Sequence, residues 1–419
     1  MKKPVLLIIP IISTLHKGRV LKPLKRVKSL LKKRVKVSSL KPVYDATNLP
    51  NIKDKNFDEI VVFVGSGGTS ETIKKIASNK DWLILAYHEN NSLASALNAK
   101  EKMVSEGIWK GKLFYTDLKS VPEEFFDEVY ASKALGLIKN LRIGLFDDEI
   151  TKLKEKIEFV NRHFQMETVL VPFEKLRLTM EEVPEKLVYR TLKQKLNGFR
   201  IVEPSKKDLE KALRLYLALR KIAQDENFGC VTFECFRFLK QTLTTPCLAF
   251  SFLKDEGIEG TCEAEILHIP VMLLLANLTG KPAWLANISG INFTKNTVTL
   301  AHCTAATKLS ISSRKILVRS HFESGLSVAL DVPLRKGVVT LTHVVQNPPT
   351  ITIVEGKILR SQLKQRNLCR TQVEVSLNCD VKDFLETTGN HQVMGYGSLT
   401  SVLKIIAEKS GLKPIILGK

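Results

Sequence analysis

The first two thirds of the chain alternate between short apolar runs and longer segments in which apolar residues recur at helical spacing. Continuous apolar runs of this length are typical of strands that are buried on both faces of a sheet. The predicted strands are residues 5–12, 59–64, 82–87, 112–116, 141–146, 167–171 and 229–233. The predicted helices include residues 19–36, 93–106, 153–164 and 205–225. This alternation predicts an α/β fold with two doubly wound parallel-sheet domains.

The last third has a different pattern, in which strand-like segments follow one another without long helices between them. Glycines and the pair Pro348–Pro349 separate these segments, which indicates an antiparallel barrel or sandwich. A final helix is predicted, with Ser398 as its cap and Gly411 at its end. We therefore expect an N-terminal α/β domain (1–138), a second α/β domain on the substrate and metal side (139–260), and a C-terminal domain with an antiparallel β-barrel and a terminal helix (261–419).

Between residues 245 and 304, polar residues lie at the joints between apolar elements. The pattern predicts a strand at 245–253, a helix at 266–278 and strands at 283–288 and 297–304. Gly280 follows the helix as a left-handed cap. Because Pro270 is best tolerated in a first turn, the regular helix is expected to begin near His268.

Four polar residues of this stretch form a candidate metal or acid/base site. Glu263 and Glu265 lie at the start of the helix, Asn287 lies near a strand end, and His302 lies in the last strand. In an open α/β sheet, sites form where the carboxyl ends of strands meet the amino ends of helices. His302 shares a strand face with apolar residues, so a structural role remains open for it. Three further histidines are interpreted as structural: His268, His321 and His343.

In the first third, the turn at residues 65–70 is rich in glycine but matches neither common phosphate-binding pattern, which favours a tight turn. His88 follows a predicted strand and either touches a ligand or is a polar loop residue.

The net charge of +21 is the unusual feature of the composition. A basic surface can bind nucleic acid, but the lysines are spread along the chain and only residues 17–36 form a dense cluster. Aromatic residues make up just 7%, and no nucleic-acid motif is present. A nucleic-acid-associated protein is therefore a minor alternative, and a surface adapted to high temperature is another explanation.

Cysteine usage and the apolar runs indicate a cytoplasmic protein with no membrane segment. The seven cysteines are an odd number without a CxxC pair, which is typical of reduced buried thiols. The apolar run at 5–12 contains Pro10 and lacks a cleavage site, so it is interpreted as the first strand rather than a signal peptide. The run at 271–276 is too short to span a bilayer.

Several motifs together resemble the L-fucose/L-arabinose isomerase superfamily, in particular its shorter L-fucose isomerase-like branch of archaeal and bacterial type. The order and spacing of the motifs carry this resemblance, which is strongest from residue 245 to the C-terminus. They are PCLAFSFLKDEGIEGTCEAE, LTGKPAWLANI, NTVTLAHCTA, SHFESGLSVAL, KGVVTLTH and GNHQVMGYGSLTSVLKIIAEKSG, with GSGGTSETI and YHENNSLASAL as looser matches.

The resemblance implies aldose–ketose isomerisation of a monosaccharide with a divalent metal, usually Mn²⁺, in a homo-oligomer such as a trimer or hexamer. It implies that Glu263 is a metal ligand and an acid/base, and that His391 is a metal ligand. His302 matches a histidine that is either a ligand or a substrate contact. We expect Glu263 and Asn287 to be catalytic, these two and His391 to hold the metal, and His302, Glu265 and His88 to contact the substrate.

Asn287 departs from the pattern, because L-fucose isomerase has an aspartate at this place. An amide can ligate weakly through its oxygen but cannot act as a base. Glu265, His302 or a hydroxide on the metal could take over that role; otherwise the activity is lost. The alternative function is therefore a catalytically inactive relative that binds a sugar or scaffolds a complex.

Overall fold

The computed structural model describes residues 3–16, 18–48, 52 and 57–418. The chain divides into two compact units, Met1–Gly136 and Leu137–Lys419, called here the N-terminal and the C-terminal unit. Each unit is described by itself.

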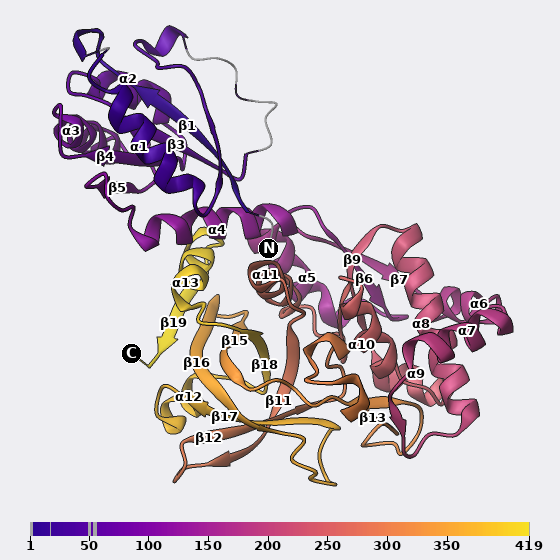
Figure 1. The fold of residues 1–419 in the computed structure, drawn as a ribbon. Helices are drawn as coiled ribbons and strands as arrows, with labels where there is room; N and C mark the ends of the chain where they lie inside the picture. Colours follow the sequence, from indigo (N-terminus) through magenta and orange to yellow (C-terminus); the bar gives the residue numbers. More distant parts are fainter. Residues whose placement is uncertain (1–2, 17, 49–51, 53–56, 419) are drawn as a thin grey trace. The chain divides into compact units, whose positions relative to one another are not determined.

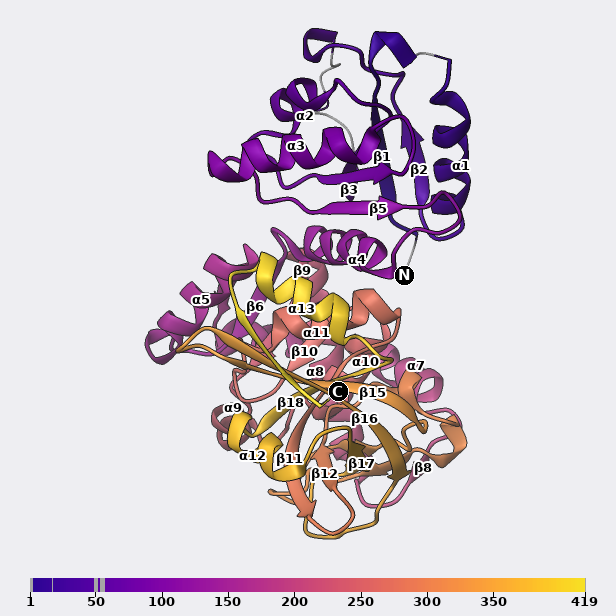
Figure 2. The same cartoon turned by 90° about the vertical axis from the view of Figure 1, so that its left-hand side faces the viewer.

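The N-terminal unit is a parallel sheet in the order β2-β1-β3-β4-β5 with helices on both faces (Figures 1 and 2). Alternate residues of β1 pack into two apolar layers on opposite faces of the sheet. Leu6 packs in the layer that contains α1 and α4, and Leu7 packs in the layer that contains α2 and α3. The strands are β1 (Val5–Ile11), β2 (Lys36–Ser39), β3 (Glu59–Val64), β4 (Leu83–Tyr87) and β5 (Leu113–Thr116). The helices are α1 (Leu21–Lys32), α2 (Ser70–Ala77), α3 (Ser92–Ser105) and α4 (Glu123–Ile138).

The C-terminal unit begins with a second parallel sheet in the order β10-β9-β6-β7. Its strands are β6 (Arg142–Phe146), β7 (Glu167–Val171), β9 (Phe228–Phe233) and β10 (Glu259–Thr261). Its helices are α5 (Lys154–Phe164), α6 (Phe173–Glu181), α7 (Glu185–Lys195), α8 (Lys206–Asp225), α9 (Cys235–Thr242), α10 (Cys247–Asp255) and α11 (Ile269–Thr279). The helix predicted at residues 205–225 is confirmed, and Ser205 and Asp208 form a reciprocal capping box at the start of α8.

A closed antiparallel barrel of six strands follows (Figure 1). The order is β15-β18-β11-β12-β17-β16, and β15 pairs with β16 to close it, while β19 (Lys413–Leu417) adds to β16 in parallel. The barrel strands are β11 (Trp284–Asn292), β12 (Thr297–His302), β15 (Gly337–Val345), β16 (Thr350–Ser361), β17 (Thr371–Leu377) and β18 (His391–Tyr396). The remaining elements are β8 (Arg200–Ile201), β13 (Leu317–Arg319) and β14 (Ala329–Asp331), which form a small sheet, and the helices α12 (Val381–Thr387) and α13 (Thr400–Lys409).

The fold class is confirmed in its coarser form, with parallel α/β sheets followed by an antiparallel barrel. The domain boundary at residue 260 stays a prediction. Two local predictions are wrong. Residues 245–253 are not a strand, because α10 occupies Cys247–Asp255. Ser398 does not cap α13, since its hydroxyl donates to Glu355 at 2.6 Å and the cap position is Leu399.

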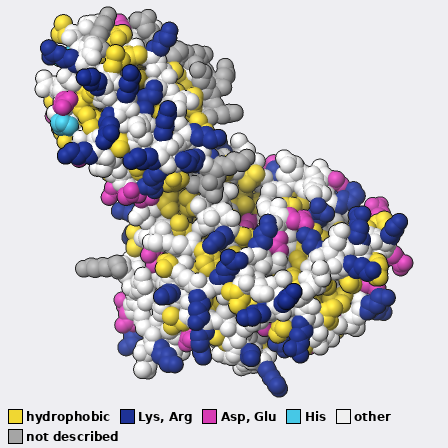
Figure 3. Space-filling view, in the orientation of Figure 1, with side chains coloured by type: hydrophobic (Ala, Val, Ile, Leu, Met, Phe, Trp, Pro, Cys, Tyr) yellow, Lys and Arg dark blue, Asp and Glu magenta, His cyan; other side chains and the backbone are white. Residues whose placement is uncertain are grey.

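Basic side chains are scattered over the visible face of each unit rather than gathered in one patch (Figure 3). On α1, Lys22, Lys25 and Arg26 are exposed while Leu24 and Val27 are buried, as the helical spacing predicts. Among the helices that the structure describes, none is long and apolar enough to cross a membrane.

Candidate metal centre

The loop between β10 and α11 carries the two predicted carboxylates. Glu263 and Ala264 both have positive φ, 59° and 49°, a conformation that is unfavourable for residues other than glycine and is often found at functional sites. The amide of Ala264 donates to the carbonyl of Phe233 at 3.0 Å, which ties this loop to the end of β9. The helix begins at Ile269 with Pro270 in its first turn, so the predicted start near His268 is confirmed and both carboxylates lie on the loop.

Glu263, His302 and His391 converge from three separate elements. His302 ends β12, His391 begins β18, and β11 lies between these strands. One ligand atom from each of the three side chains lies within 4.8 Å of the others. Among the residues that the structure describes, no other three potential metal ligands lie this close together. Two of them, Glu263 and His391, are predicted metal ligands.

The hydrogen bonding of His391 fits metal ligation. Its Nδ1 lies 2.8 Å from Oε2 of Glu265, so Nδ1 donates to that carboxylate. Its Nε2 is buried without a hydrogen-bond partner and lies 3.7 Å from Oε2 of Glu263. A buried polar atom without a partner is costly, and a metal ion between Nε2 and Glu263 would remove that cost. The residues present therefore fit a divalent metal.

Glu265 is the centre of a buried network that orients His391. Its Oε1 lies 3.6 Å from Nδ1 of His268 and 3.7 Å from Nζ of Lys156. Burial raises the pKa of the Glu265 carboxyl, but the adjacent imidazoles of His268 and His391 outweigh burial and hold that pKa well below its usual range. Burial lowers the pKa of His391, but the hydrogen bond to Glu265 outweighs this and raises it. Glu265 is therefore a carboxylate that fixes the ring of His391.

His302 is a neutral imidazole. Its Nδ1 accepts a hydrogen bond from the backbone amide of Cys303 at 3.0 Å. Burial lowers the pKa of His302 to about 4, so the ring carries a single proton near neutral pH. Because Nδ1 is an acceptor, that proton lies on Nε2. This tautomer suits a hydrogen-bond donor to a substrate oxygen better than a metal ligand.

Glu263 is the accessible member of the group, with 39% of its side chain exposed. Burial of the remainder raises the pKa of its carboxyl; His391 opposes this rise, and the neighbouring Glu323 adds to it. A narrow cavity of about 30 Å³, enough to admit a water molecule, is lined by Glu263, Asn287 and His302 among others. Room for an ion is therefore present beside the group, while a sugar has to approach from the exposed side of Glu263.

Asn287 and His88 lie in different surroundings. Asn287 faces His391 in the register of β11 and β18, and its Oδ1 accepts a hydrogen bond from Asn390 at 3.2 Å. His88 belongs to the N-terminal unit, where its exposed ring lies 3.5 Å from Oε1 of Glu89.

Sequence reasoning missed several residues near the centre. Buried His268 and half-buried His343, both interpreted as structural, form a pair with 3.1 Å between Nε2 of His268 and Nδ1 of His343. Nδ1 of His343 also lies 2.8 Å from the carbonyl of His391. Lys156 and the cavity-lining His321 and Glu323 were missed as well. Nothing in the local sequence marks these residues, because their contacts join distant segments.

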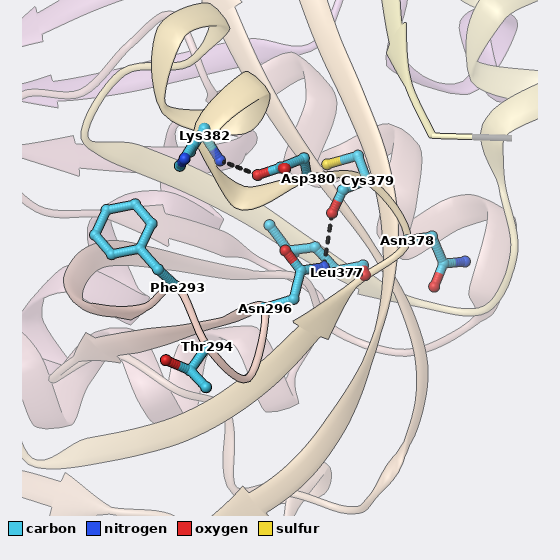
Figure 4. A pocket seen from close by; sticks show the side chains of 8 residues that line it. All are labelled: Phe293, Thr294, Asn296, Leu377, Asn378, Cys379, Asp380 and Lys382. Atoms are coloured by element: carbon cyan, nitrogen blue, oxygen red, sulfur yellow. Dashed lines mark hydrogen bonds between the residues drawn. The ribbon is translucent and has the colours of Figure 1, made fainter.

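A larger hollow of about 720 Å³ lies elsewhere on the barrel, between the turn after β11 and the start of α12 (Figure 4). Its polar side chains form hydrogen bonds with the backbone that stabilise the fold. Nδ2 of Asn296 donates to the carbonyls of Leu377 and Cys379, and Asp380 accepts from the amide of Lys382. We assign no chemistry to this hollow.

Comparisons with known proteins leave the family open. No protein-family model matches the chain, and no curated protein matches it. Among solved structures, it is similar to the apo form of "dinucleotide forming Acetyl-coenzyme A synthetase 1" from Ca. Korarchaeum cryptofilum, with 14% identity and a TM-score of 0.20 over 66% of this chain and 65% of that chain. The complex of that protein with phosphate and ADP aligns with 12% identity and a TM-score of 0.20 over 66% of each chain. Scores this low carry no argument about fold or activity.

Proposed function

We propose that this protein is a metal-dependent aldose–ketose isomerase that acts on a monosaccharide through an enediol. The convergence of Glu263, His302 and His391, with the buried Nε2 of His391 left without a partner, is the observation that carries the proposal. The sequence motifs that resemble the L-fucose isomerase-like proteins support the same reaction. A homo-oligomer, such as a trimer or hexamer, and a cytoplasmic location belong to the proposal.

Isomerisation moves a proton between adjacent carbons, which requires a base, an acid and an electrophile. The raised pKa of Glu263 suits a carboxyl that takes a proton from one carbon and returns it to the next. The Nε2 proton of neutral His302 suits donation to the oxygen on which negative charge develops. Glu265 holds His391 in place through Nδ1 and is thus a positioning residue rather than a substrate contact.

A divalent metal, when bound, would stabilise negative charge on the two sugar oxygens. Glu263, His391 and the amide oxygen of Asn287 would hold it. Oxygen and imidazole ligands suit Mn²⁺ better than a sulfur-rich zinc site would.

The second candidate function is a sugar-binding relative without catalysis, and one observation favours it. Oδ1 of Asn287 already accepts a hydrogen bond from Asn390, and an amide supplies no base. In this case the metal group binds a sugar through its hydroxyls, and Glu263 transfers no proton.

The test is metal analysis of the purified protein together with a screen for aldose–ketose interconversion in the presence of Mn²⁺. We expect bound divalent metal, interconversion of at least one sugar, and loss of turnover in Glu263→Gln. The matched control is Glu386→Gln, which changes an exposed glutamate of α12. Metal binding without turnover selects the sugar-binding relative. If no metal binds and no sugar is converted, the proposal is wrong.

A further inference from the structure

One edge of the second parallel sheet is open. β7 is the last strand in the order β10-β9-β6-β7, and among the described strands it pairs with β6 alone. The amide of Glu167 donates to the carbonyl of Leu141 at 3.1 Å, so the backbone groups of Glu167 point toward β6. Backbone groups alternate between the two sides of a strand, and those of Thr168 and Leu170 therefore point away from β6.

The outward groups of β7 have no partner among the described residues. No hydrogen bond that the structure describes involves the amide or the carbonyl of Thr168 or Leu170. Oγ1 of Thr168 is also buried without a hydrogen-bond partner. A row of unpaired backbone groups at the edge of a sheet is a template on which another strand can add.

The other sheet edges among the described strands are shorter or protected. β2 and β5 have four residues each, β10 and β14 have three, and β8 has two. β19 has five residues but carries Lys413 and Pro414, which oppose pairing at an edge. β7 also has five residues, with neither lysine nor proline, and three of them are β-branched. An edge of this kind without protection indicates a partner.

The surface beside this edge carries charges of both signs. A groove of about 580 Å³ lies between α5 and β7, and its walls are Ile157, Glu158, Asn161, Arg162, Glu167 and Thr168. α5 lies at the outer margin of the C-terminal unit (Figure 2). Glu158 and Arg162 are exposed one helical turn apart on α5, and neither belongs to an ion pair among the described residues.

We propose that the β7 edge is an interface between two copies of this chain, which pair their β7 strands antiparallel about a two-fold axis. The outward backbone groups of Thr168 and Leu170 then bond to β7 of the second copy, and the sheet continues from one copy into the other. The same axis sets the two α5 helices antiparallel, so that Glu158 of each copy meets Arg162 of the partner subunit. A second copy suits this surface because the axis pairs both charges at once.

This inference does not depend on the proposed isomerase activity. A two-fold interface gives an even number of chains, such as a dimer or a hexamer, and excludes a trimer as the complete assembly. If the protein is a trimer, the inference fails while the proposed function stands.

The test is the assembly state of the full chain, measured by sedimentation velocity over a dilution series. We expect an even number of chains. Glu158→Arg brings like charges together on both sides of the axis and should raise the dissociation constant of this interface by about 100-fold. Glu158→Arg combined with Arg162→Glu restores opposite charges and should recover the assembly. The matched control is Glu386→Arg, the same charge change on an exposed glutamate of α12, and it should assemble as the unchanged protein does.

Backbone pairing is measured on the unchanged protein, so this part of the test does not depend on a variant that folds. Hydrogen exchange should show the amides of Thr168 and Leu170 protected in the assembled protein, although no acceptor for them is described within the chain. Dilution below the dissociation constant should remove this protection. A monomer, a trimer, an even assembly that Glu158→Arg leaves intact, or rapid exchange of both amides in the assembled protein would overturn the proposal.

Discussion

Both units have a place where parallel strands end and helices begin, but the polar side chains at the two places are paired differently. In the N-terminal unit, the hydroxyl of Thr69 donates to the carbonyl of Ser66 at 2.8 Å, and the backbone amide of Thr69 donates to the hydroxyl oxygen of Ser95 at 3.1 Å. The hydroxyl of Tyr87 donates to the carbonyl of Gly65 and accepts from Asn90, both at 2.8 Å. The hydrogen bonds of these side chains hold the turns after β3 and β4 together.

At the corresponding place in the C-terminal unit, buried polar atoms lack partners. Nε2 of His391 and Nδ1 of His268 have no hydrogen bond. Glu263 adopts a left-handed conformation, although only glycine adopts it without cost. The comparison teaches that the position of a turn in an α/β sheet does not by itself identify a site. A buried imidazole without a partner beside an unfavourable backbone conformation is a stronger indication, because a fold retains such a combination only where a function or a ligand compensates for it.

The largest effect is expected when the carboxylate that orients His391 is removed. Glu265→Ala should weaken Mn²⁺ binding by about 100-fold, or about 3 kcal/mol, because a ligand without its orienting partner is no longer held in place. Titration calorimetry with Mn²⁺ measures the change. His88→Ala, in the N-terminal unit, is the control and should bind Mn²⁺ as the unchanged protein does. Equal affinities in Glu265→Ala and the unchanged protein would contradict the assigned site.

The sequence identified the carboxylates of this site but not the network behind them. Glu263 and Glu265 could be found because they directly precede an apolar helix, so the pattern around them is local. His343 could not, because it meets His268 only after the barrel closes.

The strand predicted at 245–253 shows a second limit of sequence reasoning. Every residue of α10 from Cys247 to Lys254 is buried, so the segment has no polar face to reveal the helical period. A short apolar run cannot then be distinguished from a buried strand. The barrel strands were easier, because Gly337 and the Pro348–Pro349 pair mark their ends.

A buried carboxylate of the C-terminal unit should make stability depend on pH. Burial raises the pKa of Glu259 to about 7, and the charge of buried Lys254 only partly opposes this. The folded state then holds this proton more tightly than the unfolded state, so stability falls as pH rises from the unfolded pKa through about 7. The free energy of unfolding should decrease by about 2 kcal/mol between roughly pH 5 and pH 8 from this group.

Urea unfolding of Glu259→Gln at both pH values checks this prediction. The amide cannot ionise, so the part of the decrease in the free energy of unfolding that comes from Glu259 should disappear. Glu386→Gln should keep the same slope of unfolding free energy against pH as the unchanged protein. An identical slope in all three proteins would mean that Glu259 ionises as easily in the folded chain as in the unfolded one.

The smallest effect is expected where polar atoms are already paired. Ser95→Ala removes the oxygen that accepts from the amide of Thr69 at 3.1 Å and lies 3.0 Å from its hydroxyl. The loss should destabilise the N-terminal unit by about 1 kcal/mol, since one buried amide is left without its partner. Mn²⁺ affinity should stay unchanged. Hydrogen exchange measures the stability of the N-terminal unit, and a separate Mn²⁺ titration measures the metal affinity. A change in Mn²⁺ affinity in this variant would contradict the view that this turn serves only the fold, and the contrast between the two strand ends would no longer hold.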